Sequence, residues 1–293
     1  MISIEKDKYK LLKKIKDPKF NIDNLENYYL SIQLGVRDFQ IFIFDGKDRR
    51  ALLLEDYIFE ESKMLTSHLD TLRTIFDNHH LLLAGFWKAV TVIIKNRKFT
   101  IVPESFFQKE QAYQYLSINH AIDTESHSVL SLHHQKASLV NIFGMERELV
   151  NFFNNIYINK KVKYMHQGSP LINGALKLNE DAFIVYVDRF NLHISITKSG
   201  KLTFYNQFPV KIIEDFTRYI KLVARDQGID LSQQKVLVYG FVGQNSTQYN
   251  FLNQNLANLQ FGERPKGIQF GYVFDEVADH QFFDLFSLFS IAG

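Results

Sequence analysis

Hydrophobic and polar residues alternate in two separate regions of the chain. In the first region the alternation covers residues 29–34, 39–44 and 51–59, and in the second it covers 183–187, 192–197 and 202–208. A period of two predicts strands that bury one face. The connections are short and contain Gly35, "DGKD" or "KSGK", which favours hairpins between neighbouring strands. Each region therefore predicts a three-stranded meander.

Apolar residues at helical spacing follow each meander. They are Met64, Leu65, Leu69, Leu72, Ile75 and Phe76 in the first half, and Ile212, Ile213, Phe216, Tyr219, Ile220 and Val223 in the second. This spacing predicts amphipathic helices. Further strands are predicted at 89–94, 99–102, 128–132, 137–143 and 235–239, and a helix at 105–116. Two more helices are predicted, one on Met145, Leu149, Phe152, Phe153 and Ile156, the other on Tyr249, Leu252, Leu256 and Leu259. Residues 166–181 are rich in Gly, Ser, Pro and Asn and predict a loop.

The two halves match in register and in order. Leu34, Phe39, Ile41 and Ile43 correspond to Val187, Leu192, Ile194 and Ile196 at a constant offset. Each half reads strand, strand, strand, helix, strand, helix, which predicts a mixed sheet with an antiparallel edge and a parallel edge. The fold class is therefore α/β with a duplicated βββαβα unit. We expect a basic N-terminal segment at 1–24, a first lobe at 25–165 and a second lobe at 166–293.

Composition narrows the class of protein. The chain has 293 residues, 46% hydrophobic content and a formal net charge of +2, which suits a folded globular protein and gives no overall footprint for nucleic acid. Without cysteine, thiol catalysis, disulfides and Cys-based metal sites are excluded. No apolar run reaches the ~20 residues of a membrane helix, so we expect a cytoplasmic protein without membrane insertion. The seven lysines of residues 6–19 predict a solvated tail or peripheral helix, the alternative being an anionic partner such as nucleic acid.

Short motifs in both halves resemble a known superfamily. The first strand and turn, "LSIQLGVRDFQIFIF", and the later stretch "GKLTFYNQFPVKIIEDFTRYIKLVARDQG" are similar to actin-like ATPases, the superfamily of actin, sugar kinases and chaperone ATPases. Within the superfamily, these two stretches most resemble the bacterial pilus-assembly and cell-division scaffolds. The stretch "KNRKFTIVPESFF" resembles an uncharacterised bacterial family with this fold. The resemblance implies two ribonuclease H-like lobes over about residues 25–290.

The superfamily's nucleotide site is degraded at the matching positions. Active members have Asp-x-Gly at the end of the first strand, where the acid holds magnesium through water and the glycine admits the phosphates. Gln33 and Gly35 occupy these positions here, and a neutral amide is a poor ligand for a hard divalent cation. In the second half the same register puts Tyr186 at the acid position and Asp188 at the glycine position. A shift of two residues makes Asp188 the acid but places Phe190 on the turn.

The adenosine-side turn of the superfamily is partly kept. It corresponds to "VLVYGFVG", where Gly240 survives, Phe241 replaces its partner and Gly243 follows. We therefore expect Gln33, Gly35, Asp188, Gly240 and Gly243 to line a degenerate nucleotide cleft with no required cofactor, which leaves room for weak ATP binding. No Walker loop, Gly-x-Ser-x-Gly elbow or His-Glu-x-x-His motif occurs. The favoured interpretation is a non-catalytic scaffold with an unknown protein partner or self-association; the alternative is a divergent ATPase or small-molecule kinase.

Three other groups of residues are interpreted without a specific motif. His120, His127, His133 and His134 lie near Asp123 and Glu125, but their spacing matches no known ligand motif, so a metal site is the minor alternative. Arg37 and Asp38 are expected to cap the hairpin turn, and the acidic pairs Glu55/Asp56 and Glu60/Glu61 to be solvated. The closing "FFDLFSLF" is apolar all round, which favours burial between the lobes over a partner surface.

Overall fold

The computed structural model describes residues 9–59, 69–178 and 180–291. They divide into two compact units. The first contains Met1–Gln167 and Gln269–Phe274, and the second contains Gly168–Ile268 and Asp275–Gly293. The predicted boundaries of the basic segment and the two lobes stay a prediction.

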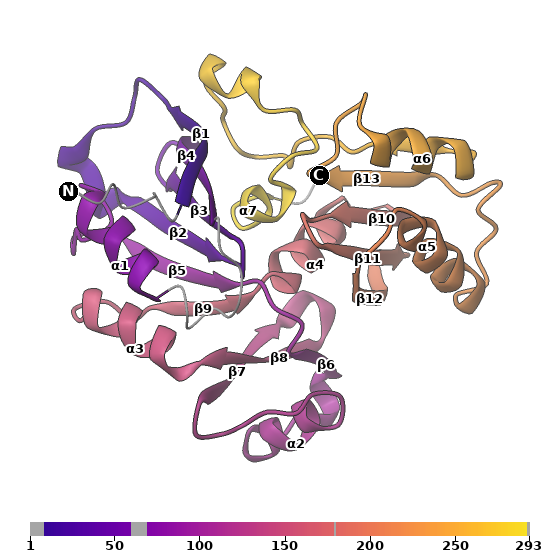
Figure 1. Ribbon diagram of the computed structural model, residues 1–293, viewed down its shortest axis with the longest axis horizontal. Helices are drawn as coiled ribbons and strands as arrows, with labels where there is room; N and C mark the ends of the chain where they lie inside the picture. Colours follow the sequence, from indigo (N-terminus) through magenta and orange to yellow (C-terminus); the bar gives the residue numbers. More distant parts are fainter. Residues whose placement is uncertain (1–8, 60–68, 179, 292–293) are drawn as a thin grey trace, which may run out of the picture. The chain divides into compact units, whose positions relative to one another are not determined.

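A six-stranded mixed sheet forms the centre of the first unit (Figure 1). Its order is β1-β4-β3-β2-β5-β9, with the bounds β1 Tyr9–Lys16, β2 Tyr28–Leu34, β3 Asp38–Asp45, β4 Arg50–Phe59, β5 Ala89–Ile94 and β9 Lys163–His166. The strands β1, β4, β3 and β2 pair antiparallel, while β2, β5 and β9 pair parallel. This confirms the predicted meander and the predicted mixed sheet; β9 was not predicted.

Residues 9–16 form an edge strand, so the prediction of a solvated tail or peripheral helix is wrong for them. β1 pairs along the outer side of β4, with an irregularity between Leu11 and Lys13. The lysines that suggested a solvated segment are compatible with a strand because they stand on the exposed edge of the sheet, where charge discourages unwanted pairing. Lys14 is also neutralised, because its Nζ lies 2.9 Å from Glu55 Oε1.

Helices α1 (Leu69–Asn78) and α3 (Arg147–Ile156) lie on one face of this sheet. Phe76 of α1 packs against Phe39 of β3 and against Phe152 and Phe153 of α3. Leu69, Leu72, Ile75 and Phe76 are buried, as their spacing predicts. Met64 and Leu65 of the predicted helix, like Glu60 and Glu61, lie outside the described residues.

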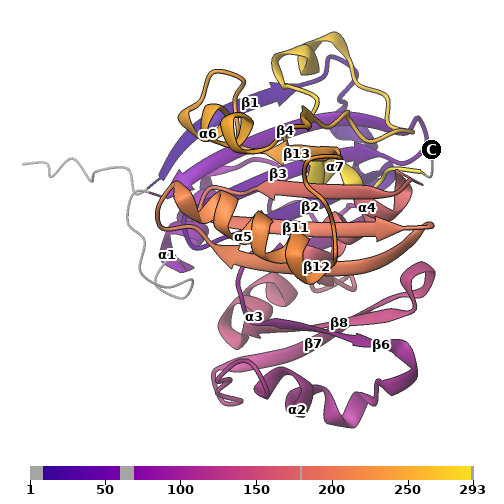
Figure 2. The ribbon, with the colours of Figure 1, turned by 90° about the vertical axis from the view of Figure 1, so that its right-hand side faces the viewer.

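A smaller antiparallel sheet is inserted between β5 and α3. Its order is β6-β8-β7, with the bounds β6 Phe99–Pro103, β7 His127–His134 and β8 Leu139–Glu146. Helix α2 (Ala112–Ser117) packs on one face of it through Leu116 (Figure 2). The predicted helix at 105–116 is mostly wrong, because short 3-10 turns at Glu104–Phe106 and Lys109–Gln111 precede this short helix.

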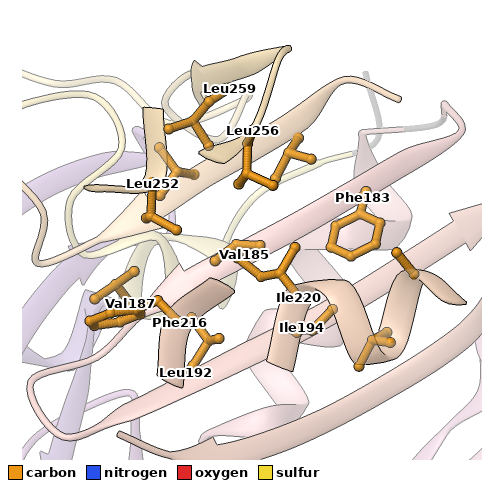
Figure 3. Packing of buried hydrophobic residues seen from close by; sticks show 14 of the residues in the cluster. Phe183, Val185, Val187, Leu192, Ile194, Phe216, Ile220, Leu252, Leu256 and Leu259 are labelled. Atoms are coloured by element: carbon orange, nitrogen blue, oxygen red, sulfur yellow. The ribbon is translucent and has the colours of Figure 1, made fainter. Parts of the chain in front are cut away.

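The second unit is built on a five-stranded mixed sheet of order β12-β11-β10-β13-β14. Its strands are β10 Ala182–Val187, β11 Asn191–Lys198, β12 Lys201–Pro209, β13 Val236–Gly240 and β14 Leu259–Phe261. Helices α5 (Glu214–Asp226) and α6 (Thr247–Asn255) cover one face. Side chains such as Phe183, Ile194, Phe216 and Leu252 interlock there to form a core cluster (Figure 3).

Helices α4 (Gly168–Lys177) and α7 (Phe283–Ser287) contribute to a second core cluster on the same sheet. α4 occupies residues predicted as a loop, so that prediction is wrong. Its Gly, Ser, Pro and Asn residues are typical of loops, but Leu171 and Ala175 are one helical turn apart and are buried against the sheet, so tertiary packing outweighs the weak helix propensity. Phe282, Phe283, Leu285 and Phe286 are buried, and Phe283 packs within the second unit. The predicted burial is confirmed, while its predicted place between the lobes stays a prediction.

Two helix ends differ from prediction. Met145, assigned to a helix, lies in β8, and α3 begins only at Arg147. Leu256 and Leu259 lie beyond the end of α6, and Leu259 belongs to β14. In each case a buried residue of a strand or loop continued the helical spacing by coincidence. No helix in the described part of the chain combines the length and apolar character needed to cross a bilayer.

Candidate functional site

Two equivalent hairpin turns contain residues of the predicted nucleotide cleft, one turn in each unit. In the first, Leu34 pairs with Phe39, and the Gly35 N–H donates to the Asp38 carbonyl over 2.9 Å. In the second, Val187 pairs with Leu192, and the Asp188 N–H donates to the Asn191 carbonyl over 2.9 Å. The backbone geometry therefore makes Gly35 and Asp188 equivalent, with Gln33 and Tyr186 two positions earlier. This is the register inferred from the sequence.

The acid position of the first turn carries an amide that belongs to a polar row across three strands. Gln33 Nε2 donates to Gln40 Oε1 over 2.8 Å, and Gln40 Nε2 donates to Asp56 Oδ1 over 3.0 Å. All three residues are buried. A carboxylate at position 33 would offer an anionic ligand to magnesium, whereas the neutral amide is oriented by hydrogen bonds within the sheet.

An ion pair closes the first turn. Lys95, the residue after β5, places its Nζ 2.5 Å from Asp38 Oδ2, and both side chains are buried. The turn is tight, since a Cβ at Gly35 would lie 2.2 Å from Asp38 Oδ1. Asp38 thus does more than cap a hairpin: its carboxylate neutralises the one ammonium group in this turn, and a charge that is paired in this way is less available to a phosphate or a metal ion.

The second turn is closed by an aromatic ring. Phe241 follows β13 as Lys95 follows β5, because the Phe241 N–H donates to the Val187 carbonyl and the Lys95 N–H donates to the Leu34 carbonyl. The Arg189 guanidinium lies 4.1 Å from the centre of the Phe241 ring. Asp188 is buried and its Oδ1 accepts the Arg189 N–H over 2.9 Å. Position 188 therefore carries a carboxylate on a turn that has no glycine.

Gly240 is the last residue of β13, and Gly243 lies in the loop between β13 and α6. Gly240 has φ +96°, and a Cβ there would lie 2.2 Å from the Val187 carbonyl oxygen, so the position requires glycine. The Gly243 carbonyl accepts the N–H of Ser246, the residue that caps α6. The structure thus brings Asp188 and Gly240 together within the second unit, and Gln33 and Gly35 together within the first.

In each unit a buried histidine forms a hydrogen bond with the loop that follows the central parallel strand, β5 or β13. His166 Nε2 donates to the Asn96 carbonyl over 2.8 Å and its ring stacks on Phe99. His280 Nε2 donates to the Val242 carbonyl over 2.6 Å and its ring stacks on Phe261. Both carbonyls are two residues beyond the end of the central parallel strand. Burial lowers the pKa of His166 to about 4 and also lowers the pKa of His280, so both rings are neutral near pH 7. Sequence reasoning missed both, because each partner is a distant backbone atom.

The expectation that Glu55 and Asp56 are solvated is wrong. Both lie inside β4 and are buried, and Asp56 ends the polar row described above. Glu55 Oε1 forms an ion pair with Lys14 Nζ over 2.9 Å, and Oε2 lies 2.5 Å from the Tyr57 hydroxyl and 2.8 Å from His79 Nε2. Burial alone would raise the pKa of Glu55, but the hydrogen bonds from His79, Lys14 and Tyr57 outweigh it and lower that pKa to about 2. β4 is buried at every position from Ala51 to Tyr57, so an alternating pattern does not distinguish its two acidic residues from their neighbours.

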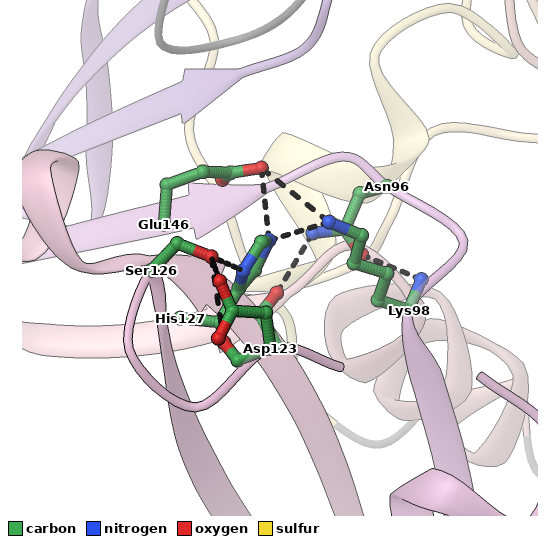
Figure 4. Close-up of polar contacts among 7 residues, drawn as sticks. Asn96, Lys98, Asp123, Ser126, His127 and Glu146 are labelled. Carbon is green, nitrogen blue, oxygen red and sulfur yellow. Dashed lines mark hydrogen bonds and ion pairs between the residues drawn. The ribbon is translucent and has the colours of Figure 1, made fainter. Parts of the chain in front are cut away.

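The histidine-rich segment forms a polar cluster around a lysine. Lys98 Nζ lies 2.5 Å from His127 Nε2, and Ser126 Oγ lies 2.9 Å from His127 Nδ1 (Figure 4). Glu146 Oε1 lies 3.6 Å from His127 Nε2 and 3.8 Å from Lys98 Nζ. The ammonium group thus stands where a cation bound by His127 and Glu146 would stand. Among the described residues, no three His, Asp or Glu side chains gather in a metal-ligating arrangement.

Solved structures define the class of protein. A protein from Bacteroides thetaiotaomicron VPI-5482, described as having an actin-like ATPase fold and unknown function, matches with a TM-score of 0.76 and 22% identity over 92% of this chain and 98% of that one. The ethanolamine utilization protein EutJ from Carboxydothermus hydrogenoformans matches with a TM-score of 0.50 and 10% identity over 95% and 93% of the two chains. A type IV pilus biogenesis complex, PilM–PilN, matches with 0.53 and 11% over 89% and 97%. The chain is thus a mixed α/β protein with the actin-like ATPase fold.

The family is equally clear. Residues 17–259 match the family described as "Protein of unknown function (DUF3822)", and the chain belongs to it. The comparison with curated proteins gave no match. The predicted resemblance to an uncharacterised family with the actin-like fold is therefore confirmed.

Proposed function

We propose that this protein is a non-catalytic member of the actin-like fold that serves as an interaction scaffold in a bacterial assembly. The observation that supports the loss of catalysis most directly is the first hairpin turn. Its acid position is Gln33, held by Gln40, and its one ammonium group, on Lys95, is neutralised by Asp38. A phosphoryl-transfer site needs the opposite arrangement, with an anionic magnesium ligand and uncompensated donors facing the phosphates.

The second turn supports the same proposal. A residue with a side chain, Asp188, stands where the fold's second phosphate turn would need glycine, and Tyr186 stands at the acid position. At this turn the Arg189 guanidinium contacts the face of the Phe241 ring. The backbone amides at Asp188 and Phe241 are used in the sheet itself. The space around Gly243 favours the competing function, weak nucleotide binding through the adenosine side.

The scaffold role draws on the fold and on the surface. One relative of similar fold is described as part of a complex, PilM–PilN, so this architecture is used for partner binding in at least that case. Large apolar side chains such as Phe86 and Ile158 are exposed in this chain. Exposed side chains of this kind are common where a partner docks.

A titration with ATP and magnesium tests the loss of catalysis. We expect calorimetry on the full chain to give no binding heat up to millimolar nucleotide and no phosphate release. A dissociation constant below ~100 µM, on the order of −5.5 kcal/mol, would instead favour a divergent ATP-binding protein. Asp188→Asn and Gly243→Val would then be the variants to compare, with Asp181→Asn as a matched exposed control in the same unit.

A capture experiment tests the scaffold role. Tagged full-length protein, cross-linked in the cells that produce it naturally, should recover a stoichiometric protein partner identified by mass spectrometry and reconstituted from purified components. A purified chain that neither recovers such a partner nor self-associates in sedimentation would contradict the scaffold proposal.

A further inference from the structure

Two loops meet at one end of the six-stranded sheet of the first unit. Residues 79–88 lead into β5, and residues 157–162 lead into β9. Since β5 and β9 are parallel, both loops lie at the end of the sheet where these strands begin. The Tyr157 hydroxyl donates to the Leu82 carbonyl over 2.7 Å and joins them. We call the exposed side chains of these loops the two-loop surface.

Large apolar side chains are exposed on the two-loop surface. Leu83 is 52% exposed, Phe86 is 75% exposed and Ile158 is 79% exposed. Their immediate neighbours Leu82, Trp87 and Tyr157 are buried, so the backbone that carries the exposed side chains is anchored in the core. A Phe and an Ile held in water at fixed positions forgo the favourable transfer free energy that burial would give them. Large apolar side chains that are exposed on neighbouring loops are common at interaction sites.

The charge of the two-loop surface has one sign. Residues 79–88 and 157–162 contain Lys88, Lys160 and Lys161 and no Asp or Glu. Lys88 Nζ lies 5.2 Å from the centre of the Tyr29 ring. Within the described residues, no carboxylate forms an ion pair with Lys160 or Lys161. The two loops therefore carry two lysines without a carboxylate partner in addition to three exposed apolar side chains.

We infer that the two-loop surface docks an acidic, amphipathic segment of a partner protein, an inference that rests on the proposed scaffold function. Carboxylates of the partner would pair with the lysines, and its apolar residues would cover Phe86, Ile158 and Leu83. A second copy of this chain fits poorly, because an isologous contact would bring the same lysines face to face. A lipid surface fits less well than a protein, because the Tyr157 hydrogen bond and buried Trp87 fix the exposed apolar side chains at set positions, which pockets on a partner would use and a fluid bilayer would not.

A peptide selection tests the inference without knowledge of the partner. Full-length protein is panned against displayed random 16-residue peptides, and the selected peptides are synthesised and titrated by fluorescence anisotropy. We expect the selected peptides to be richer in Asp, Glu and large apolar residues than the starting library. Phe86→Ser and Ile158→Ser should each weaken binding about tenfold or more, as truncation of an interface anchor does. Raising the salt should weaken it as well.

Matched variants keep the result specific. Ile212→Ser removes a side chain that is 58% exposed in the second unit, and it should leave peptide binding unchanged. Lys160→Glu with Lys161→Glu should shift the selected peptides towards basic sequences, which a purely structural role of these loops would not do. Folding of each variant is checked by the fluorescence of Trp87, the only tryptophan in the chain.

Three results would overturn the inference. They are a selection that yields no binding peptide, peptides without an acidic bias, and binding that is indifferent to Phe86→Ser. Tight binding to phosphatidylglycerol vesicles that Phe86→Ser abolishes, in the absence of peptide binding, would also overturn it in favour of a membrane surface. The proposed loss of catalysis fails separately, through ATP binding or phosphate release, and neither result changes the peptide selection.

Discussion

The two hairpin turns share a backbone and differ in how their side chains close it. In each turn the N–H of the first residue, Gly35 or Asp188, donates to the carbonyl three residues later. In each unit the residue after the neighbouring parallel strand, Lys95 or Phe241, donates its N–H to the last carbonyl of the strand before the turn. The first turn then places the Lys95 ammonium on Asp38, while the second places the Arg189 guanidinium on the Phe241 ring. Backbone hydrogen bonds thus maintain the geometry of both turns although the side chains that close them differ.

The two turns should also differ in how strongly substitution lowers the free energy of unfolding. A buried ion pair depends on both partners, since removing one leaves an uncompensated charge in a poorly solvated place. A cation–π contact at a partly exposed site has no such dependence and contributes about 0.5 to 1 kcal/mol. The first turn should therefore be sensitive to substitution and the second tolerant of it.

Loss of the Lys95 side chain should have the largest effect. Lys95→Met leaves the Asp38 carboxylate buried without its partner, and we expect a loss of about 3 to 5 kcal/mol in the free energy of unfolding. Urea denaturation followed by Trp87 fluorescence measures it in the first unit. The double variant Lys95→Met with Asp38→Leu should recover a large part of the loss. A single variant as stable as the parent would mean that the ion pair does not hold the turn.

Gly240→Ala should have the next largest effect. The new methyl group would meet the Val187 carbonyl oxygen at a position with positive φ, at a cost of about 2 to 3 kcal/mol. The equivalent position in the first unit is Ile94, which pairs with Leu34 as Gly240 pairs with Val187. Far-UV circular dichroism in urea gives the comparison, with the exposed Gly200→Asn as a control for a positive φ without a clash. If both variants lost the same free energy of unfolding, the positive φ, and not the contact with Val187, would be the reason that position 240 requires glycine.

His166 and His280 should make stability fall with acid. The pKa of His166 is lowered to about 4 in the folded state, against 6.5 for the free side chain. The stabilising contribution is therefore complete above about pH 7 and is lost as the pH falls from 6.5 towards 4. Between pH 7 and pH 5 the loss for His166 alone is about 2 kcal/mol.

Substitution tests this pH dependence. His166→Phe should flatten the stability profile between pH 7 and pH 5, measured by urea denaturation at each pH, and His280→Phe should flatten it as well, because its pKa is also lowered. His133→Phe is the control, as this side chain is exposed and faces Glu104 at the surface. A profile that keeps its slope in His166→Phe would contradict the assignment.

The smallest effect should come from the second turn. Phe241→Ala removes the ring that contacts Arg189 and Phe282, and we expect a loss of about 1 kcal/mol. Arg189→Gln keeps the Phe282 contact and should lose less, and the double variant should lose little more than Phe241→Ala. Thermal and urea unfolding of the four proteins form the cycle. A loss comparable to that of Lys95→Met would remove the contrast between the turns.

Local patterns could predict the strands and the equivalence of the turns, because alternation and the constant offset between Leu34 and Val187 depend only on neighbours in sequence. The closure of the turns could not be predicted, because Lys95 lies 57 residues from Asp38, and nothing local distinguishes this lysine from a solvated one. Glu55 was misread for the related reason that two distant residues, Lys14 and His79, help to stabilise its charge. α4 was misread because its packing partners, not its composition, make it a helix.

The return of residues 269–274 to the first unit makes that unit discontinuous in sequence. There the backbone of Gln269 bonds to Arg49 and Ala51, and Gly271 stands close to the Asp17–Arg50 ion pair. A gene fragment that stops at residue 167 would therefore encode a first unit without one of its own pieces. Expressed in two parts, the protein should reassemble only when the second fragment supplies this segment in trans, which makes the chain a natural candidate for a split reporter of association.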